Sequence, residues 1–261
     1  MQLITELSIC GIFRNNERYL RIFFIPMFRR LEEMHPHIKF NYYLYENDST
    51  DGTAEIIKSL GGISEILNKP MNPRDTSKQR LDAIAQARDK LLEQRPFKGE
   101  WCMFIDSDIW FHIGLLTHFI NRQLPDDASC VTCNGTDIHI CKNHPNCPNY
   151  HYYDTLALVY KNGNDGFTNM RNGFKNFMTK GFSCCPFSEP EDIERWQCGD
   201  MVETESSFGG LAFYRTHEVN KSHMFYGECI EERCDHTYFN VRLEGKVYAD
   251  PLMRVVMREQ T

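Results

Sequence analysis

The stretch that decides the fold is Trp101-Cys102-Met103-Phe104-Ile105-Asp106-Ser107-Asp108. Five mostly apolar residues end abruptly in two carboxylates that are separated by one small residue. This pattern predicts a buried strand that delivers both acids to the carboxyl edge of an open α/β sheet, where such folds bind ligands. The competing interpretation is a solvated turn, because Asp and Ser are common turn residues.

Two carboxylates as close as Asp106 and Asp108 repel each other unless a cation lies between them. Hard oxygen donors suit Mg²⁺ or Mn²⁺, and these ions usually also hold substrate phosphates. The sequence therefore predicts a divalent-metal site at this edge of the sheet.

Composition narrows the class of protein. The chain has 261 residues, 41% of them hydrophobic and 25% charged, which is typical of a soluble globular α/β protein. A net charge of -7 without a dominant basic patch argues against a nucleic-acid partner. No stretch reaches the roughly 18–20 apolar residues that cross a bilayer, and no signal-peptide cleavage pattern follows residues 3–13. We expect a cytoplasmic protein with no transmembrane segment and no evident protein partner.

The first half of the chain alternates between strand and helix patterns. Apolar runs predict strands, and apolar residues at helical spacing predict helices between them. This rhythm indicates parallel crossovers and a mixed central sheet flanked by helices in a single domain, residues 1–261. Residues 1–110 would form a nucleotide-binding half and residues 111–261 an acceptor-binding half. The strands are expected over 3–13, 40–45, 63–67 and 101–105, and helices over 19–31, from 53 to about 60, 75–94 and 112–121.

The second half is less regular. Residues 133–150, rich in Asn, Cys, His and Pro, predict a long loop. A strand is expected over 208–214, a short helix over 234–243, and a last strand over 247–249 that ends before Pro251.

A second polar segment follows the strand at 40–45. It reads Glu46-Asn47-Asp48-Ser49-Thr50-Asp51-Gly52-Thr53 and would face the same carboxyl edge as Asp106. Its acidic and amide groups can accept hydrogen bonds from a nucleobase or from ribose hydroxyls. The alternative is a capped turn whose polar residues serve local hydrogen bonds, with Ser49 or Asp51 as the N-cap.

These two segments together resemble the GT-A superfamily of glycosyltransferases, which use nucleotide-sugar donors. Three further segments look like the capsule-associated, cryptococcal-type α-mannosyltransferase group, and the resemblance spans about residues 5–251. They are Tyr152-Tyr153-Asp154-Thr155-Leu156-Ala157, Ser206-Ser207-Phe208-Gly209-Gly210-Leu211-Ala212 and Cys234-Asp235-His236-Thr237.

The resemblance implies a role for each matching residue. Asp108 would bind the metal directly, Asp106 would contact ribose or the metal through water, and His236 would be a late metal ligand. The alternative for His236 is a helix-surface histidine without function. The residues implied to bind the donor nucleotide are Glu46 and Asp48 at the nucleoside, Arg80 with its neighbour Ser77 at base or diphosphate, and Gly209 and Gly210, whose lack of a side chain permits close approach to a sugar.

The catalytic group is less defined. An inverting enzyme needs a carboxylate near the acceptor hydroxyl, and Asp154, Glu203 and Glu205 are the candidates. A retaining enzyme, which the mannosyltransferase resemblance implies, needs no such base. Asp154 would then bind sugar hydroxyls, or it has a structural role.

The eleven cysteines favour free thiols in a reducing compartment. Cys130 and Cys133, with Cys141, Cys147, His139 and His144, leave a zinc site and disulfides open as alternatives. The spacing is irregular, however, and Cys130 and Cys133 would point to opposite faces of a strand.

The sequence predicts a metal-dependent glycosyltransferase of the hexosyltransferase type. It would use Mn²⁺ or Mg²⁺ to transfer a hexose, deoxyhexose or pentose from a UDP- or GDP-sugar to a glycan, glycoconjugate or other hydroxyl acceptor. The alternative is a non-catalytic nucleotide-sugar- or glycan-binding module on the same fold. A nucleotidyltransferase is disfavoured, because residues 9–17 lack the glycine-rich basic loop of that class.

Overall fold

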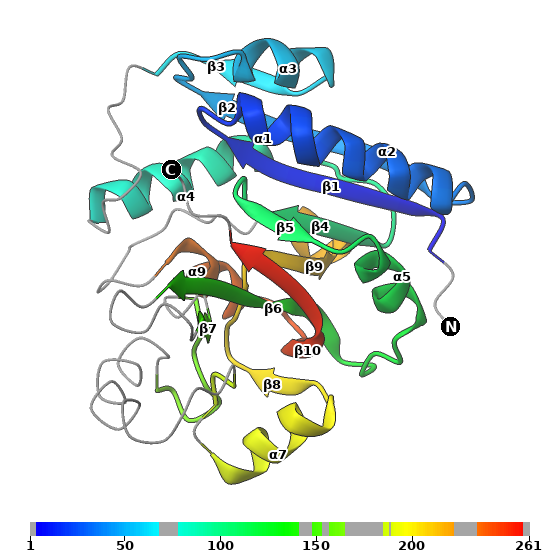
Figure 1. The fold of residues 1–261 in the computed structure, drawn as a ribbon, viewed down its shortest axis with the longest axis vertical. Helices are drawn as coiled ribbons and strands as arrows, with labels where there is room; N and C mark the ends of the chain where they lie inside the picture. The colour runs from blue at the N-terminus through cyan, green and yellow to red at the C-terminus, as the bar shows by residue number, and fades with distance from the viewer. Residues whose placement is uncertain are drawn as a thin grey trace.

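The computed structural model describes residues 4–67, 78–140, 148–152, 157–164, 185–187, 189–221 and 234–257. Within these ranges a mixed sheet of ten strands runs through the molecule in the order β3-β2-β1-β4-β9-β6-β10-β5, with β7 paired to β6 and β8 to β10. Helices lie on both faces of this sheet (Figure 1). The predicted α/β class, with a mixed central sheet flanked by helices, is confirmed.

The parallel half of the sheet follows the predicted rhythm. It contains β1 (Glu6–Phe13), β2 (Lys39–Asn47), β3 (Ile63–Glu65) and β4 (Trp101–Ile105). β1 is parallel to both β2 and β4, and β2 is parallel to β3. All five residues of β4 are buried, as a central parallel strand requires. Because these strands are parallel, their carboxyl ends meet at one edge.

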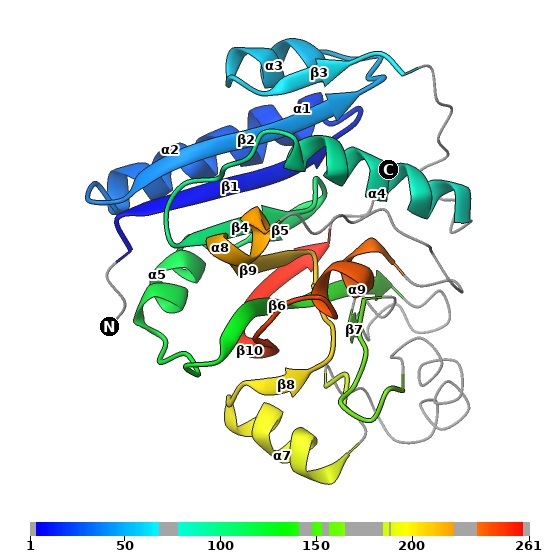
Figure 2. The same ribbon diagram turned by 180° about the vertical axis from the view of Figure 1, so that it is seen from behind.

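Two helical layers enclose the sheet. On one face α2 (Ile25–Met34) and α5 (Gly114–Asn121) supply aromatic and aliphatic side chains to the larger core cluster. On the other face lie α4 (Lys78–Leu92), α8 (Thr216–Asn220) and α9 (Asp235–Asn240), seen in front in Figure 2. The helix α3 (Thr53–Ser59) connects β2 to β3.

The helix expected over 19–31 is longer and irregular. It consists of α1 (Glu17–Tyr19), the π-helical turn η1 (Leu20–Phe24) and α2. Pro26 lies in the first turn of α2, directly after the π-helical turn η1, and has no N–H to donate to that preceding turn.

The prediction of a loop over 133–150 is wrong for the residues that the structure describes. β6 (Ala128–Ile140) continues to Ile140, and β7 (Pro148–Tyr152) returns antiparallel to it. The polar composition suggested a loop, but pairing with β10, β9 and β7 overrides local propensity.

The end of the sheet also differs from expectation. β10 (Lys246–Met257) does not stop before Pro251, and β5 (Ile109–Phe111), which pairs with it, was not expected. Pro251 lies in the register shift between Asp250 and Arg254, where a missing donor is tolerated. The remaining elements are α7 (Pro190–Cys198), β8 (Val202–Thr204) and β9 (Leu211–Arg215), which covers most of the strand expected over 208–214.

Candidate active site

The Asp-Ser-Asp segment follows β4 directly at the carboxyl edge of the parallel strands, as predicted. The Asp106 amide donates to the carbonyl of Gly210, 2.9 Å away, which joins this segment to the glycine turn before β9. The side chain of Asp106 is 21% exposed, and Asp108 is half-buried. Both carboxylates therefore lie at the border between the sheet and solvent.

A tyrosine from the first helix supports the same segment. Tyr19 Oη donates to the carbonyl of Ile109 at 2.6 Å and so holds the backbone that follows Asp108. Burial raises the pKa of Tyr19 well above its ordinary value, and the charges of Asp108 and Asp106 raise it further. Both carboxylates are thus electrostatic neighbours of one neutral phenol.

The loop after β1 joins the two predicted motifs. Asn16 donates from Nδ2 to the carbonyl of Ser107 at 3.3 Å, and its backbone N–H donates to Thr53 Oγ1 at 2.8 Å. Asn15 Oδ1 accepts the backbone N–H of Thr50 at 2.7 Å. Residues 46–53 and 106–108, far apart in sequence, are therefore held by the same short loop.

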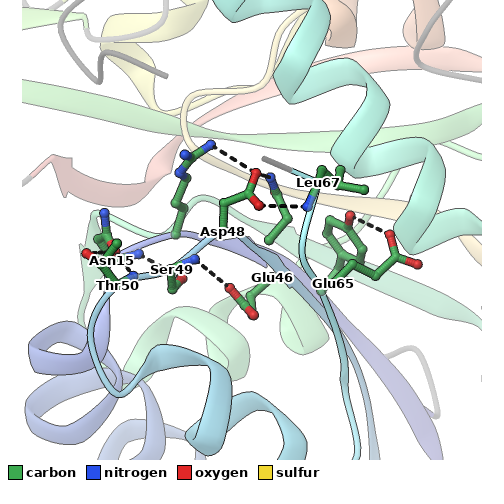
Figure 3. Close-up of polar contacts among 10 residues, drawn as sticks. Asn15, Glu46, Asp48, Ser49, Thr50, Glu65 and Leu67 are labelled. Atoms are coloured by element: carbon green, nitrogen blue, oxygen red, sulfur yellow. Dashed lines mark hydrogen bonds and ion pairs between the residues drawn. The ribbon is translucent and has the colours of Figure 1, made fainter. Parts of the chain in front are cut away.

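The polar groups of residues 46–53 are mostly engaged by the chain itself (Figure 3). Glu46 is buried; its carboxylate accepts the N–H of Ser49 at 3.3 Å and the hydroxyl of Ser64. Asp48 has a φ of 56° and accepts the N–H of Leu67 at 2.7 Å. Through these hydrogen bonds, both acids fix the conformation of the loop.

A cation that sequence reasoning missed lies beside this loop. Arg14 Nη1 is 3.9 Å from Asp48 Oδ2, and the Arg14 side chain is partly exposed. The signal was visible in the sequence, because an arginine follows the first strand directly, at the edge where the other polar segments end.

A second cation that was not among the predicted site residues is Arg88, on the inner face of α4. Its Nη2 is 2.9 Å from Asp106 Oδ1, and its Nε donates to Asp235 Oδ2 at the start of α9. Burial alone lowers the pKa of Arg88, but the charges of Asp235 and Asp106 outweigh it, so the net shift is upward. The guanidinium therefore stays charged.

The sequence contained a signal for Arg88. It falls on the apolar stripe of the predicted helix, four residues after Ile84 and three before Leu91. A cation on a buried stripe needs an acidic partner. Arg80, predicted at the donor, lies earlier on α4, and its positive charge also acts on Asp235.

His236 is buried in α9 rather than lying on a helix surface. Its ring stacks on Phe208 with centroids 3.5 Å apart, and its Nδ1 is 3.0 Å from Tyr214 Oη. Tyr214 also donates to Asn240 Oδ1 at 3.0 Å. Burial, followed by the charge of Arg88, lowers the pKa of His236 well below its ordinary value, so its ring is neutral.

The backbone conformation of the turn before β9 requires glycine. Gly209 and Gly210 have φ values of 66° and 81°, which favour glycine. A Cβ on Gly209 would lie 2.0 Å from the carbonyl oxygen of Cys133, and one on Gly135 would lie 2.3 Å from the carbonyl of Gly209. The backbone of the turn before β9 is thus in direct contact with the backbone of β6.

Two of the three predicted base candidates, Glu203 and Glu205, lie within the described residues. Glu205 is exposed, and its N–H donates to the carbonyl of Val159 at 3.0 Å. Glu203 forms ion pairs with Lys161 and Lys246 at 3.2 and 3.3 Å. The other two predicted residues, Asp154 and Ser77, lie outside the described residues.

The described ranges contain no group of three or more His, Cys, Asp or Glu side chains that could hold a metal ion. The predicted set of Asp106, Asp108 and His236 is therefore not assembled there as a closed cluster. The two aspartates nevertheless fit Mg²⁺ or Mn²⁺, because such ions are commonly held by one or two carboxylates together with substrate phosphates.

The cysteines in the described ranges are free thiols. Cys130 belongs to one core cluster and Cys133 to the other, so they point to opposite faces of β6, as expected. Cys141, Cys147 and His144 lie outside the described residues. In the described part of the chain, no helix is long and apolar enough to span a membrane.

One solved structure supports this architecture, and a second is similar over most of this chain. GalNAc-T7 with UDP, GalNAc and Mn2+ matches 98% of this chain and 44% of its own, with a TM-score of 0.53 and 14% identity. S. aureus TarS 1-349 in complex with UDP-GlcNAc matches 98% of this chain and 60% of its own, with a TM-score of 0.46 and 14% identity. This chain thus spans about half the length of these proteins.

The fold is that of the GT-A class of glycosyltransferases. The profile of glycosyl transferase family 2 matches residues 8–189, which include β1 to β7 and the Asp-Ser-Asp segment. The chain belongs to glycosyl transferase family 2. A search of curated proteins finds no match.

Proposed function

We propose that this chain is a metal-dependent hexosyltransferase that moves a sugar from a nucleoside diphosphate to a hydroxyl of a glycan or other acceptor. One observation supports this most: Asn16 ties Ser107 of the Asp-Ser-Asp segment to Thr53 of the donor loop. Two acids, two arginines and a nucleoside-facing loop thereby converge on one sheet edge, within a chain of glycosyl transferase family 2.

The proposed division of labour between the two acids follows the resemblance to GT-A glycosyltransferases. Asp108 would bind Mn²⁺ or Mg²⁺ directly, whereas Asp106, which already pairs with Arg88, would contact ribose or the metal through water. The bound ion would act as a Lewis acid for the departing diphosphate. Arg80 would add positive charge near the diphosphate. Ser77 would donate a hydrogen bond there.

Nucleoside recognition is assigned to the loop in Figure 3. The intramolecular bonds of Glu46 and Asp48 keep this loop in shape, and Arg14 beside Asp48 can donate to a carbonyl oxygen of uracil or guanine. Residues 1–110 would thus hold the donor and residues 111–261 the acceptor.

In the turn before β9, Gly210 would let the donor sugar approach the backbone, whereas the Cβ position of Gly209 faces the carbonyl oxygen of Cys133, 2.0 Å away. On the acceptor side, Glu205 and Asp154 are the proposed acidic groups, as a base in an inverting enzyme or as sugar-binding groups in a retaining one. The resemblance to the cryptococcal-type mannosyltransferases favours a guanosine donor, and the UDP in the GalNAc-T7 structure favours a uridine donor.

A thermal-shift screen tests the proposal. UDP, GDP and their sugars are each measured with and without Mn²⁺, because a ligand that binds only the native state at one hundred times its Kd stabilises it by about 2.7 kcal/mol. A Mn²⁺-dependent upward shift, lost in Asp108→Ala, is expected. The absence of any shift would contradict the proposal.

Donor hydrolysis separates an enzyme from the alternative, a non-catalytic binding module. With Mn²⁺ present and no acceptor, a glycosyltransferase slowly releases free sugar from its donor, whereas a module binds the nucleotide sugar and leaves it intact. The Asp108→Ala variant is the control in both assays.

A further inference from the structure

Arg88 joins two acids that are 129 residues apart in the chain and come from different parts of the fold. We infer that Arg88 is a positioning residue that fixes Asp106 at the donor site and couples it to α9. The inference rests on the proposed function, because it assumes that Asp106 faces the donor.

The geometry of this bridge requires an arginine. Nε faces Asp235 and Nη2 faces Asp106, so two nitrogens of one planar guanidinium bind two different acids. The guanidinium carbon also lies 5.3 Å from the centre of the Phe208 ring, the same ring that stacks on His236. A lysine has one compact ammonium group and cannot reproduce this arrangement.

Arg88 and Asp235 are more deeply buried than Asp106. The side chains of Arg88 and Asp235 are 6% and 4% exposed, whereas Asp106 is 21% exposed. Two acids facing one buried space repel each other when no cation separates them. Buried ion pairs seldom add stability over apolar packing of the whole group, but removing the cation alone would leave the buried carboxylate of Asp235 uncompensated. Arg88 therefore holds both acids, and Asp106 is the more exposed of the two.

The bridge also connects both parts of the proposed site. Asp106 follows β4 in the donor half, and Asp235 begins α9, which also contains His236. Movement of α9 would pull on Arg88, and Arg88 would transmit that movement to Asp106. Arg88 thus acts through Asp106 and need not contact the donor itself.

The first test measures binding rather than turnover. Calorimetric titration with Mn²⁺ plus UDP, and with Mn²⁺ plus GDP, is carried out on the wild type, Arg88→Lys and Asp235→Asn. We expect affinity to fall by about tenfold or more in Arg88→Lys, the range seen when residues that orient metal ligands are changed. Asp235→Asn, which keeps Arg88 and the shape of α9, should give a smaller loss.

Arg215→Lys is the matched control. Arg215 is also an arginine in a partly buried ion pair, with Glu100, and it lies over the Trp101 ring at the opposite end of β4. The control should lower the urea midpoint without changing nucleotide affinity. If Arg88→Lys behaves in the same way, Arg88 is structural and the inference is wrong.

The second test requires no ligand. Urea midpoints are measured for Asp106→Asn, Asp235→Asn and the double variant. Each single variant removes one of these two acids from Arg88, whereas the double variant removes both, so the double loss should exceed the sum of the single losses. Additive losses would overturn the coupling. If the wild type binds neither nucleotide with Mn²⁺, the proposed function fails, and the double-mutant cycle still decides whether Arg88 couples Asp106 to α9.

Discussion

The backbone N–H of Asp106 donates to the carbonyl of Gly210 across 2.9 Å, so the first acid of the Asp-Ser-Asp segment is held by a glycine turn about one hundred residues later in the chain. This bond continues the antiparallel pairing of β4 with β9, in which Ile105 is opposite Leu211. The position of the acid thus depends on a turn whose own conformation requires glycine.

Gly209→Ala should destabilise the protein strongly. Its Cβ would meet the carbonyl oxygen of Cys133 at 2.0 Å, and a positive φ adds strain, so we expect a loss of about 2–4 kcal/mol in the free energy of unfolding. Gly61→Ala is the control, since Gly61 has a φ of 81° and open space around its Cβ. Chemical denaturation of both variants measures the difference, and equal losses would mean that the packing against β6 is looser than described.

Asp108→Asn should abolish Mn²⁺-dependent nucleotide binding at little cost to the fold. The half-buried Asp108 side chain lies at the site border, so we expect a change within about 1 kcal/mol in unfolding free energy. Asp106→Asn should cost more, because it removes one anionic partner of buried Arg88. Thermal shifts with and without Mn²⁺ measure both effects; retained Mn²⁺ dependence in Asp108→Asn would exclude Asp108 as a ligand.

Tyr214→Phe should destabilise the protein by about 1–3 kcal/mol, because it leaves His236 Nδ1 and Asn240 Oδ1 buried without the hydroxyl that serves both. Tyr248→Phe removes a hydroxyl that donates to the surface residue Asp127, and the expected loss is below about 1 kcal/mol. Urea denaturation of the two variants gives the comparison. Equal losses would show that the buried network does not depend on Tyr214.

His35 gives a pH-dependent prediction. Burial, with a smaller effect of the charge of His37, lowers the pKa of His35 below its ordinary value of 6.5, and Nε2 lies 3.1 Å from Thr117 Oγ1. Because the unfolded chain binds the proton more tightly, this contribution to stability is complete above pH 6.5 and is lost as the pH falls below it.

The variant His35→Gln keeps a hydrogen-bonding side chain without the titration. Between about pH 8 and about pH 5, the stability advantage of the wild type over this variant should therefore shrink. Unfolding free energies across this range measure it. An advantage that does not change with pH would show that the pKa of His35 is not lowered.

Several features could be predicted from the sequence because they depend on neighbouring residues. The strand over 101–105 was expected at its observed bounds, since a fully apolar run next to two acids is a local signal. The helix over 78–92 lies within the expected 75–94, because its apolar spacing spans four turns. The polar segments after β2 and β4 then lie at the same edge of the sheet, because the two strands run in the same direction.

Other features depend on partners far away in the chain. The described residues of the loop expected over 133–150 are strand, because β6 pairs there with β10 and β7. β10 passes Pro251 because a register shift accommodates the missing N–H. No local pattern contains these pairings, since each depends on a segment that arrives from elsewhere.

The sequence by itself determined the class of fold and the identity of the acids at the sheet edge, since both follow from local polarity and spacing. Only the tertiary structure decided that Asp106 is held by Arg88 and Gly210, and that His236 lies beneath Phe208. The physical reason is that a buried charge is stabilised by whichever opposite charge the fold brings to it, and that partner is set by packing across the sheet rather than by neighbouring sequence.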